Sequence, residues 1–119
     1  MSRDSKHESL EAWILQLPKV GKAPHRFGGT EFQVGGIEFM HSHGHSFFDI
    51  RLSKTDQAMV LKNGDALPHR FAPQAGWVSL RIEKQEDLDR ARRIIQLAYE
   101  NAKKNLEEIE SRRTRSNSS

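Results

Sequence analysis

The sequence predicts an α+β domain, with a mainly antiparallel sheet, helices on one face and the element order α-β-β-β-α-β-α. Two patterns carry this prediction. Apolar residues recur at spacings of three and four near both ends of the chain, as in amphipathic helices, and alternate with polar residues in the middle, as in strands. A short glycine turn joins the first two alternating segments, which is typical of an antiparallel hairpin. The 119 residues suffice for one domain.

The first helix is expected over Ser5–Leu17. Ser5 and Glu8 fit the capping-box pattern, in which each side chain bonds the backbone N–H of the other's position. One apolar helical face follows, and Pro18 ends it. That face consists of Leu10, Trp13, Ile14 and Leu17. Residues 20–29 contain three glycines and a proline, so no long element is predicted there.

The first two strands, Thr30–Val34 and Ile37–Ser42, flank Gly35-Gly36, a pair that accepts the positive φ of a two-residue hairpin turn. A third strand is expected around Phe48–Leu52. Pairing across the turn places one set of apolar residues on a single face, with Glu31, Gln33 and Glu38 on the other. The apolar set is Phe32, Val34, Ile37 and Phe39, continued by Phe48, Ile50 and Leu52.

The second helix begins at a capping serine, Ser53, and ends near Gly64. A loop over Asp65–Gly76 leads into the fourth strand, Trp77–Ile82, in which Val78, Leu80 and Ile82 alternate with polar residues. The last helix starts near Gln85 and carries one apolar stripe up to Ile109. The stripe consists of Leu88, Ala91, Ile95, Ala98, Ala102, Leu106 and Ile109. The domain is therefore expected over residues 5–109, followed by a disordered basic tail over residues 110–119.

Composition limits the function classes. Three of the 19 lysine and arginine residues lie in the last eight positions, which leaves 16 basic against 16 acidic residues in the rest of the chain. A nucleic-acid partner is therefore not favoured. The absence of cysteine excludes disulfides and thiolate chemistry. Apolar runs reach only four residues, far below the roughly 20 of a membrane span, so a soluble, cytoplasmic protein is expected.

The segment His41-Ser42-His43-Gly44-His45 is the first candidate for chemistry. Residues i and i+2 of a strand point the same way about 6.7 Å apart, so His41 and His43 can converge on one metal ion. His45 lies too far along a straight strand unless Gly44 bends it, and the third ligand otherwise comes from His69, His25 or Asp49. We predict His41, His43 and His69, holding zinc or another divalent metal. The alternative is a polar strand end.

The second candidate is a repeated motif, Pro-His-Arg-Phe, at residues 24–27 and 68–71. Each copy offers an imidazole and a planar guanidinium, which suit an anion. Alternatively, the phenylalanines anchor loops and the arginines pair with local acids. Asp49 and Arg51 share the open face of the third strand. The predicted ligand-binding residues are His25, Arg26, His41, His43, Asp49, Arg51, His69 and Arg70.

From Leu10 to Ala102 the sequence resembles the small bacterial "luciferase domain" family. The most specific segments are Pro24–Gly36, His41-x-His43-Gly44, Asp49, Pro68-His69 and Gly76-Trp77-Val78. The second half more distantly resembles MmcQ/YjbR-like proteins, whose fold is a compact α+β sheet with helices on one side. The family form usually continues after His43-Gly44 with Asp or a small residue, so any role of His45 is particular to this chain. No catalytic residues follow from the resemblance.

Three functions remain open at this level. The first is binding of a small or anionic ligand through the His/Arg cluster. The second is a non-enzymatic module that binds a protein or nucleic acid through the open sheet face and basic tail. The third is a metal-dependent site at the His-x-His-x-His segment. No flavin is expected, because a flavin-dependent luciferase barrel needs roughly 250 residues. The sequence leaves open whether the domain is an enzyme and which oligomer it forms.

Overall fold

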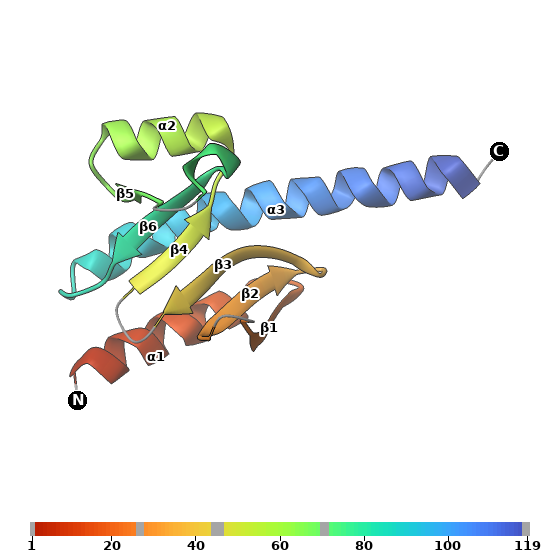
Figure 1. Ribbon diagram of the computed structural model, residues 1–119. Helices are drawn as coiled ribbons and strands as arrows, with labels where there is room; N and C mark the ends of the chain where they lie inside the picture. Colours follow the sequence, from red (N-terminus) through yellow and green to blue (C-terminus); the bar gives the residue numbers. More distant parts are fainter. Residues whose placement is uncertain (1, 26–27, 44–46, 70–71, 118–119) are drawn as a thin grey trace.

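The computed structural model describes residues 2–25, 28–43, 47–69 and 72–117. It confirms the α+β class: a six-stranded antiparallel sheet in the order β1-β2-β3-β4-β6-β5, with three α-helices (Figure 1). The helices are α1 (Ser2–Leu15), α2 (Lys54–Lys62) and α3 (Asp87–Asn117), and a 3-10 turn, η1, spans Pro73–Ala75. The strands are β1 (Val20–Pro24), β2 (Thr30–Val34), β3 (Ile37–His43), β4 (Phe47–Arg51), β5 (Leu67–Pro68) and β6 (Trp77–Arg81).

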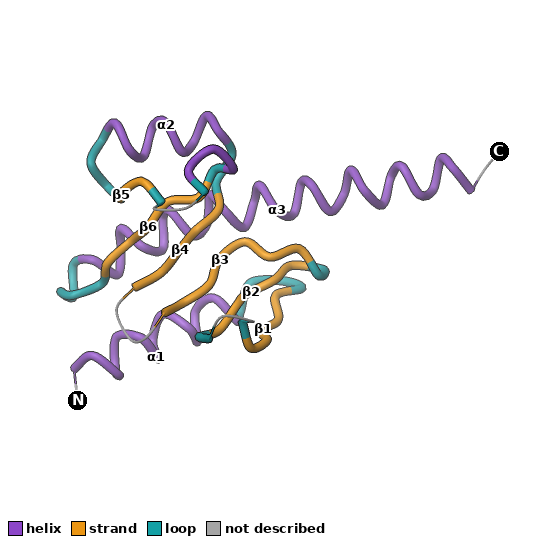
Figure 2. The backbone as a smooth tube through the Cα atoms, in the orientation of Figure 1, coloured by secondary structure: helices purple, strands orange, loops and turns teal. Residues whose placement is uncertain are grey.

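Helices α1 and α3 pack together and cover one face of the sheet, where α3 crosses β2, β3 and β4. Helix α2 lies beside β6 at the β5 end of the sheet (Figures 1 and 2). The core between the sheet and the helices contains the apolar residues predicted for the strands, with Ile37 only partly buried. It also contains the predicted apolar residues of the first and last helices except Ile109, which is exposed. The fully buried aromatic residues there are Phe32, Phe39 and Phe48. None of the helices in the described residues is long and apolar enough to cross a membrane.

A β-bulge in β3 determines which of its residues face the core and which face the opposite side of the sheet. Phe32 pairs with Met40 and Gln33 pairs with Glu38, so Phe39 is an extra residue on β3. Phe39 and Met40 are both buried in the core. The extra residue reverses the alternation, and His41 therefore shares the opposite face with Glu38, three positions earlier. Without the bulge, strict alternation from Phe39 would turn His41 into the apolar core.

Two local predictions are confirmed. The hairpin turn at Gly35-Gly36 has φ values of +56° and +87°, the left-handed region that glycine adopts without a steric cost. Ser53 caps α2, since its Oγ accepts a hydrogen bond from the backbone N–H of Asp56 at 3.1 Å. Buried Gln57 then donates to the carbonyls of Pro73 and Trp77, which ties α2 to η1 and to the start of β6.

The element boundaries differ in four places. Helix α1 begins at Ser2 and ends at Leu15, so Ser5 lies inside it and is not its cap. Strand β1 occupies residues predicted to be irregular, because pairing with β2 supplies its order in place of an apolar pattern of its own. The two-residue β5 lies in the predicted loop over Asp65–Gly76.

The fourth difference is at the C-terminus. Helix α3 continues to Asn117, so residues 110–117 are helical and not the predicted disordered tail. The sequence offers one local contribution: Glu108 and Arg112 stand at i and i+4, an order that stabilises a solvated helix. The described side chains over residues 107–115 are all exposed, and this part of α3 extends past the sheet (Figure 1).

Candidate functional site

The candidate site lies on the sheet face opposite α1 and α3. A pocket of about 890 Å³ opens there. That size suits a small-molecule site. The centre of its floor comes from three neighbouring strands, because His41 of β3 pairs with Asp49 of β4, and Asp49 pairs with Ser79 of β6. The pocket is lined by His25, Glu38, His41, His43, Phe47, Asp49, Leu67, Pro68, His69, Ala72, Trp77 and Ser79.

The carboxylate of Asp49 is the centre of the polar cluster. Its Oδ2 lies 3.0 Å from Nε2 of His41, 3.0 Å from Nε2 of His43 and 3.4 Å from Nε2 of His69. Its Oδ1 accepts a hydrogen bond of 2.7 Å from the Ser79 hydroxyl. The side chain of Asp49 is only 8% exposed, and that of His43 is 41% exposed. Three imidazoles from β3 and the segment after β5 thus converge on one buried oxygen.

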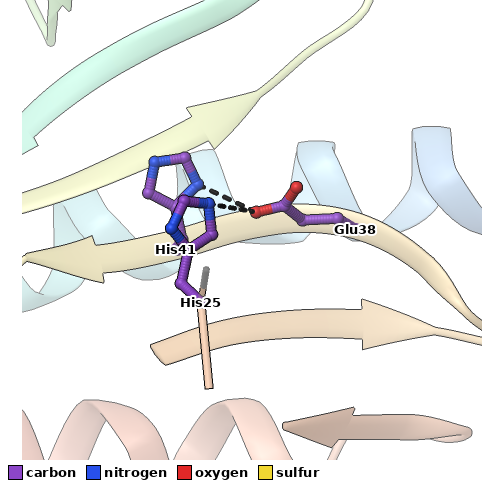
Figure 3. Close-up of side chains that lie close together, drawn as sticks. All are labelled: His25, Glu38 and His41. Carbon is purple, nitrogen blue, oxygen red and sulfur yellow. Dashed lines mark hydrogen bonds and ion pairs between the residues drawn. The ribbon is translucent and has the colours of Figure 1, made fainter. Parts of the chain in front are cut away.

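Glu38 contacts the second ring nitrogen of His41, on the side away from Asp49. Its Oε2 lies 2.9 Å from Nδ1 of His41 and 3.7 Å from Nε2 of His25, whose ring stacks on that of His41 with centroids 4.3 Å apart (Figure 3). The bulge at Phe39 makes this contact possible, because it places Glu38 and His41 on the same face. His41 therefore lies between two carboxylates, one at each ring nitrogen.

The charges of the cluster shift two pKa values. Burial alone would lower the pKa of His41, but the hydrogen bonds and charges of Asp49 and Glu38 outweigh it and raise that pKa to about 9. Burial alone would raise the pKa of Asp49, but hydrogen bonds from His41 and Ser79, with the nearby imidazoles, lower it to about 2. In the metal-free protein near neutral pH, an imidazolium at His41 therefore bridges two carboxylates.

His69 has a fixed tautomer. The backbone N–H of Ala72 donates to Nδ1 of His69 at 2.9 Å, so Nδ1 has no hydrogen of its own. The hydrogen of the ring is therefore on Nε2, which points toward Asp49. His69 thus acts as a hydrogen-bond donor within the pocket.

Apolar side chains form the rest of the pocket. The Trp77 ring lies 5.0 Å from the ring of His41 and 6.0 Å from that of His69, measured between centroids. Phe47 and Leu67 also line the wall, and Leu67 is 61% exposed. The polar groups thus gather on the floor, while the apolar groups surround them.

Within the part of the chain that the structure describes, two combinations of residues offer metal-ligand geometry. One ligand atom from each of His41, Asp49 and His69 lies within 4.8 Å of the others. The same holds for His25, Glu38 and His41. Both combinations share His41. His43 belongs to neither combination, although its Nε2 contacts the same oxygen of Asp49.

The structure places five of the predicted site residues in this pocket: His25, His41, His43, Asp49 and His69. Arg51 is an exception, because its side chain is exposed and its Nε donates to the carbonyl of Ala75. Arg26, Arg70 and His45 lie outside the described residues. The described lining residues of the pocket therefore include no arginine.

Among the described lining residues that sequence reasoning missed, three contact the polar cluster around Asp49: Glu38, Ser79 and Trp77. Glu38 and Ser79 had a usable signal, since each was placed opposite the apolar face of its strand. Trp77 had no such signal, because a tryptophan at the start of a strand is typical of the hydrophobic core. The repeated Pro-His-Arg-Phe motif was informative in one respect: the histidines of both copies, His25 and His69, line the same pocket.

A match to a known protein family covers most of the residues that line this site. A family model described as "Luciferase domain" matches residues 36–98, which is more than half of the chain. The chain belongs to the luciferase domain family. The matched segment contains Glu38, His41, His43, Asp49 and His69, whereas His25 precedes it. A search of curated proteins found no significant match.

Proposed function

We propose that the domain binds a divalent transition-metal ion beside Asp49, at the floor of a small-molecule pocket. One observation carries the proposal: the Nε2 atoms of three histidines surround a single carboxylate oxygen at 3.0–3.4 Å. A carboxylate oxygen has two lone pairs, so three ring N–H groups compete for two good positions. A metal ion relieves this competition, because imidazole lone pairs and the oxygen then bind the ion together.

The separations from the Asp49 oxygen suit such an ion, since its Oδ2 lies 3.0 Å from Nε2 of His41 and 3.0 Å from Nε2 of His43. In a tetrahedral zinc site, bonds of about 2.1 Å place the ligand atoms about 3.3 Å apart. The cluster also has the outer contacts that metal ligands need. Glu38 accepts from Nδ1–H of His41, which leaves Nε2 of that ring available for the ion, and Ser79 orients the Asp49 carboxylate.

We assign His41, His43 and Asp49 as the ligands. His69 lies near enough, but its Nε2 bears a hydrogen as long as Ala72 donates to its Nδ1. His43 has no such constraint in the described contacts, and its partly exposed side chain has room to turn toward the ion. Two histidines and one carboxylate leave positions open for water or a ligand, as in sites for zinc or Fe(II). A bound divalent ion would polarise an oxygen of that ligand.

Charge favours a metal over a directly bound anion. The described lining residues include two carboxylates, Glu38 and Asp49, and the imidazolium of His41 lies between them. Arg51 does not line the pocket, and its guanidinium donates to the carbonyl of Ala75. Among the described lining residues, an anion alone would meet these two carboxylates, whereas a dication is attracted by them.

Calorimetry and elemental analysis with zinc test the proposal, on protein purified without a histidine tag. The wild type should bind one zinc ion per chain. His41→Ala and Asp49→Asn should lower the affinity at least about 100-fold, since each removes a ligand. His7→Gln is the matched control, because His7 pairs with Glu11 on α1 and lies outside the pocket. Absence of zinc from the wild type, or equal affinity in the ligand variants and the control, would overturn the proposal.

A further inference from the structure

We infer that the ligand of this pocket is a small aromatic or otherwise apolar molecule that carries one anionic oxygen group, such as a carboxylate. This inference rests on the proposed metal site and names the class of molecule that site takes. Three features of the pocket support it: the separation of polar and apolar lining, the fixed donor at His69, and the balance of charge.

The lining separates a polar floor from an apolar wall. Asp49, His41 and Ser79 are all buried at the centre of the sheet. Trp77, Phe47 and Leu67 stand around them, with Pro68 and Ala72 beside His69. Trp77 offers a flat ring next to the rings of His41 and His69. Such a wall gains free energy from an apolar body, and an aromatic ring adds favourable ring contacts.

His69 specifies an acceptor on the ligand. Because Ala72 fixes its tautomer, Nε2–H is always presented toward the floor, 3.4 Å from Asp49 Oδ2. That separation is too long for a strong hydrogen bond, so the donor can turn to a better acceptor beside Asp49. A ligand oxygen bound to the metal would occupy that place and accept from His69. An anionic oxygen is favoured, since charge-assisted hydrogen bonds are stronger than neutral ones.

The charge balance makes ligand binding depend on the metal. Glu38 and Asp49 carry two negative charges, which a dication neutralises. At this described part of the lining, the carboxylates therefore repel an anion in the metal-free pocket, whereas the metal-loaded pocket accepts it. Metal and anionic ligand should consequently bind with positive coupling, each raising the affinity of the other.

Benzoate is the probe. Three comparison compounds each change one feature of it: acetate lacks the ring, benzamide lacks the charge, and benzylamine carries a positive charge. Binding is followed by the fluorescence of Trp77 in a Trp13→Phe background, where Trp77 is the one remaining tryptophan. The zinc-loaded protein should bind benzoate at least about tenfold more tightly than each comparison compound. Removal of zinc should weaken benzoate binding at least about tenfold.

Variants locate the binding site. Leu67→Ser removes an apolar wall residue and should weaken benzoate binding by roughly fivefold. His69→Ala removes the donor and should weaken it by roughly tenfold. Met59→Ser is the matched control, because Met59 is a similarly exposed apolar residue on α2 outside the pocket. It should leave benzoate affinity unchanged.

The outcomes separate the two proposals. If the wild type takes up no zinc, the metal site fails and this inference fails with it. If zinc binds but benzoate binds no better than acetate or benzylamine, only the inference is overturned. Equal benzoate affinity in Leu67→Ser, His69→Ala and Met59→Ser would place benzoate elsewhere on the protein and would also overturn it.

Discussion

The two faces of the sheet use the same strands for different purposes. On β4, Phe48 and Ile50 face α1 and α3 in the core, whereas Asp49 between them faces the pocket. On β6, Val78 and Leu80 face the core, and Ser79 faces the pocket. The pleat thus separates stability from chemistry one residue at a time. Substitutions on the core face should change the free energy of unfolding, and those on the pocket face should change what binds.

The separation is imperfect at one point, because the polar face is itself deeply buried. His41 is 8% exposed and Asp49 is 6% exposed, close to core values. Buried charges are tolerated only when they are paired and hydrogen-bonded. The contacts with Glu38 and Ser79 meet that need, and they also hold His41 and Asp49 in position.

The largest expected effect is on the core face. Ile50→Ala should lower the free energy of unfolding by about 2–5 kcal/mol, because it removes a fully buried side chain and leaves a cavity. Urea unfolding measures this loss. The folded fraction should still bind one zinc ion. A neutral effect on stability would mean that Ile50 does not pack as the strand register requires.

A change of pH should act on the pocket face. In metal-free protein, the raised pKa of His41 stabilises the fold fully below about pH 6.5. This stability should be lost as pH rises toward about 9, the pKa of His41 in the folded state. The lowered pKa of Asp49 has the opposite sign, and its contribution should be lost only as pH falls from about 3.8 toward 2.

Thermal melts between pH 6 and 9.5, with a chelator present, measure this effect. The decline above pH 6.5 should be smaller in His41→Gln, which cannot titrate. Identical pH profiles in the wild type and His41→Gln would show that His41 is not held as an imidazolium between Glu38 and Asp49.

A smaller effect on stability is expected at the N-terminus of α2. Ser53→Ala should cost about 1 kcal/mol, because it removes the cap of α2 at Asp56. Chemical denaturation provides the value. Ser53→Asp keeps a capping oxygen and should retain most of the stability. Equal losses in both variants would mean that the cap contributes little.

The smallest effect is expected for the end of α3. Removal of residues 110–119 should leave the melting temperature unchanged within error, since the described side chains there are exposed and bury no apolar surface. Parallel thermal melts of the full chain and the shortened chain test this. A clear loss of stability would show that this part of α3 packs against something, such as a second copy of the chain.

Local patterns were enough to predict most of the fold. The hairpin glycines, the Ser53 cap and the alternation in β4 and β6 are local features, and the structure confirms them. Strands β1 and β5 were missed because each is ordered by its partner strand. The end of α3 was missed because the disorder prediction relied on the lack of apolar residues, whereas charge pairs at i and i+4 also support a helix.

The site was harder to predict because it depends on one irregularity. The sequence indicates that His41 and His43 share a side of their strand, but not which side. The bulge at Phe39 decides this, and no residue in β3 signals it. The convergence of His25 and His69 depends on contacts between segments more than 40 residues apart, which a motif of four residues could suggest but not place.

The most direct test of the metal site is an anomalous difference map from crystals of the untagged protein grown with zinc. One strong peak should lie about 2.0–2.2 Å from Nε2 of His41, Nε2 of His43 and Oδ2 of Asp49, with Nε2 of His69 directed at the next ligand of the ion. A zinc peak elsewhere, or imidazoles that keep their contacts with Asp49 and hold no ion at saturating zinc, would contradict the proposed function.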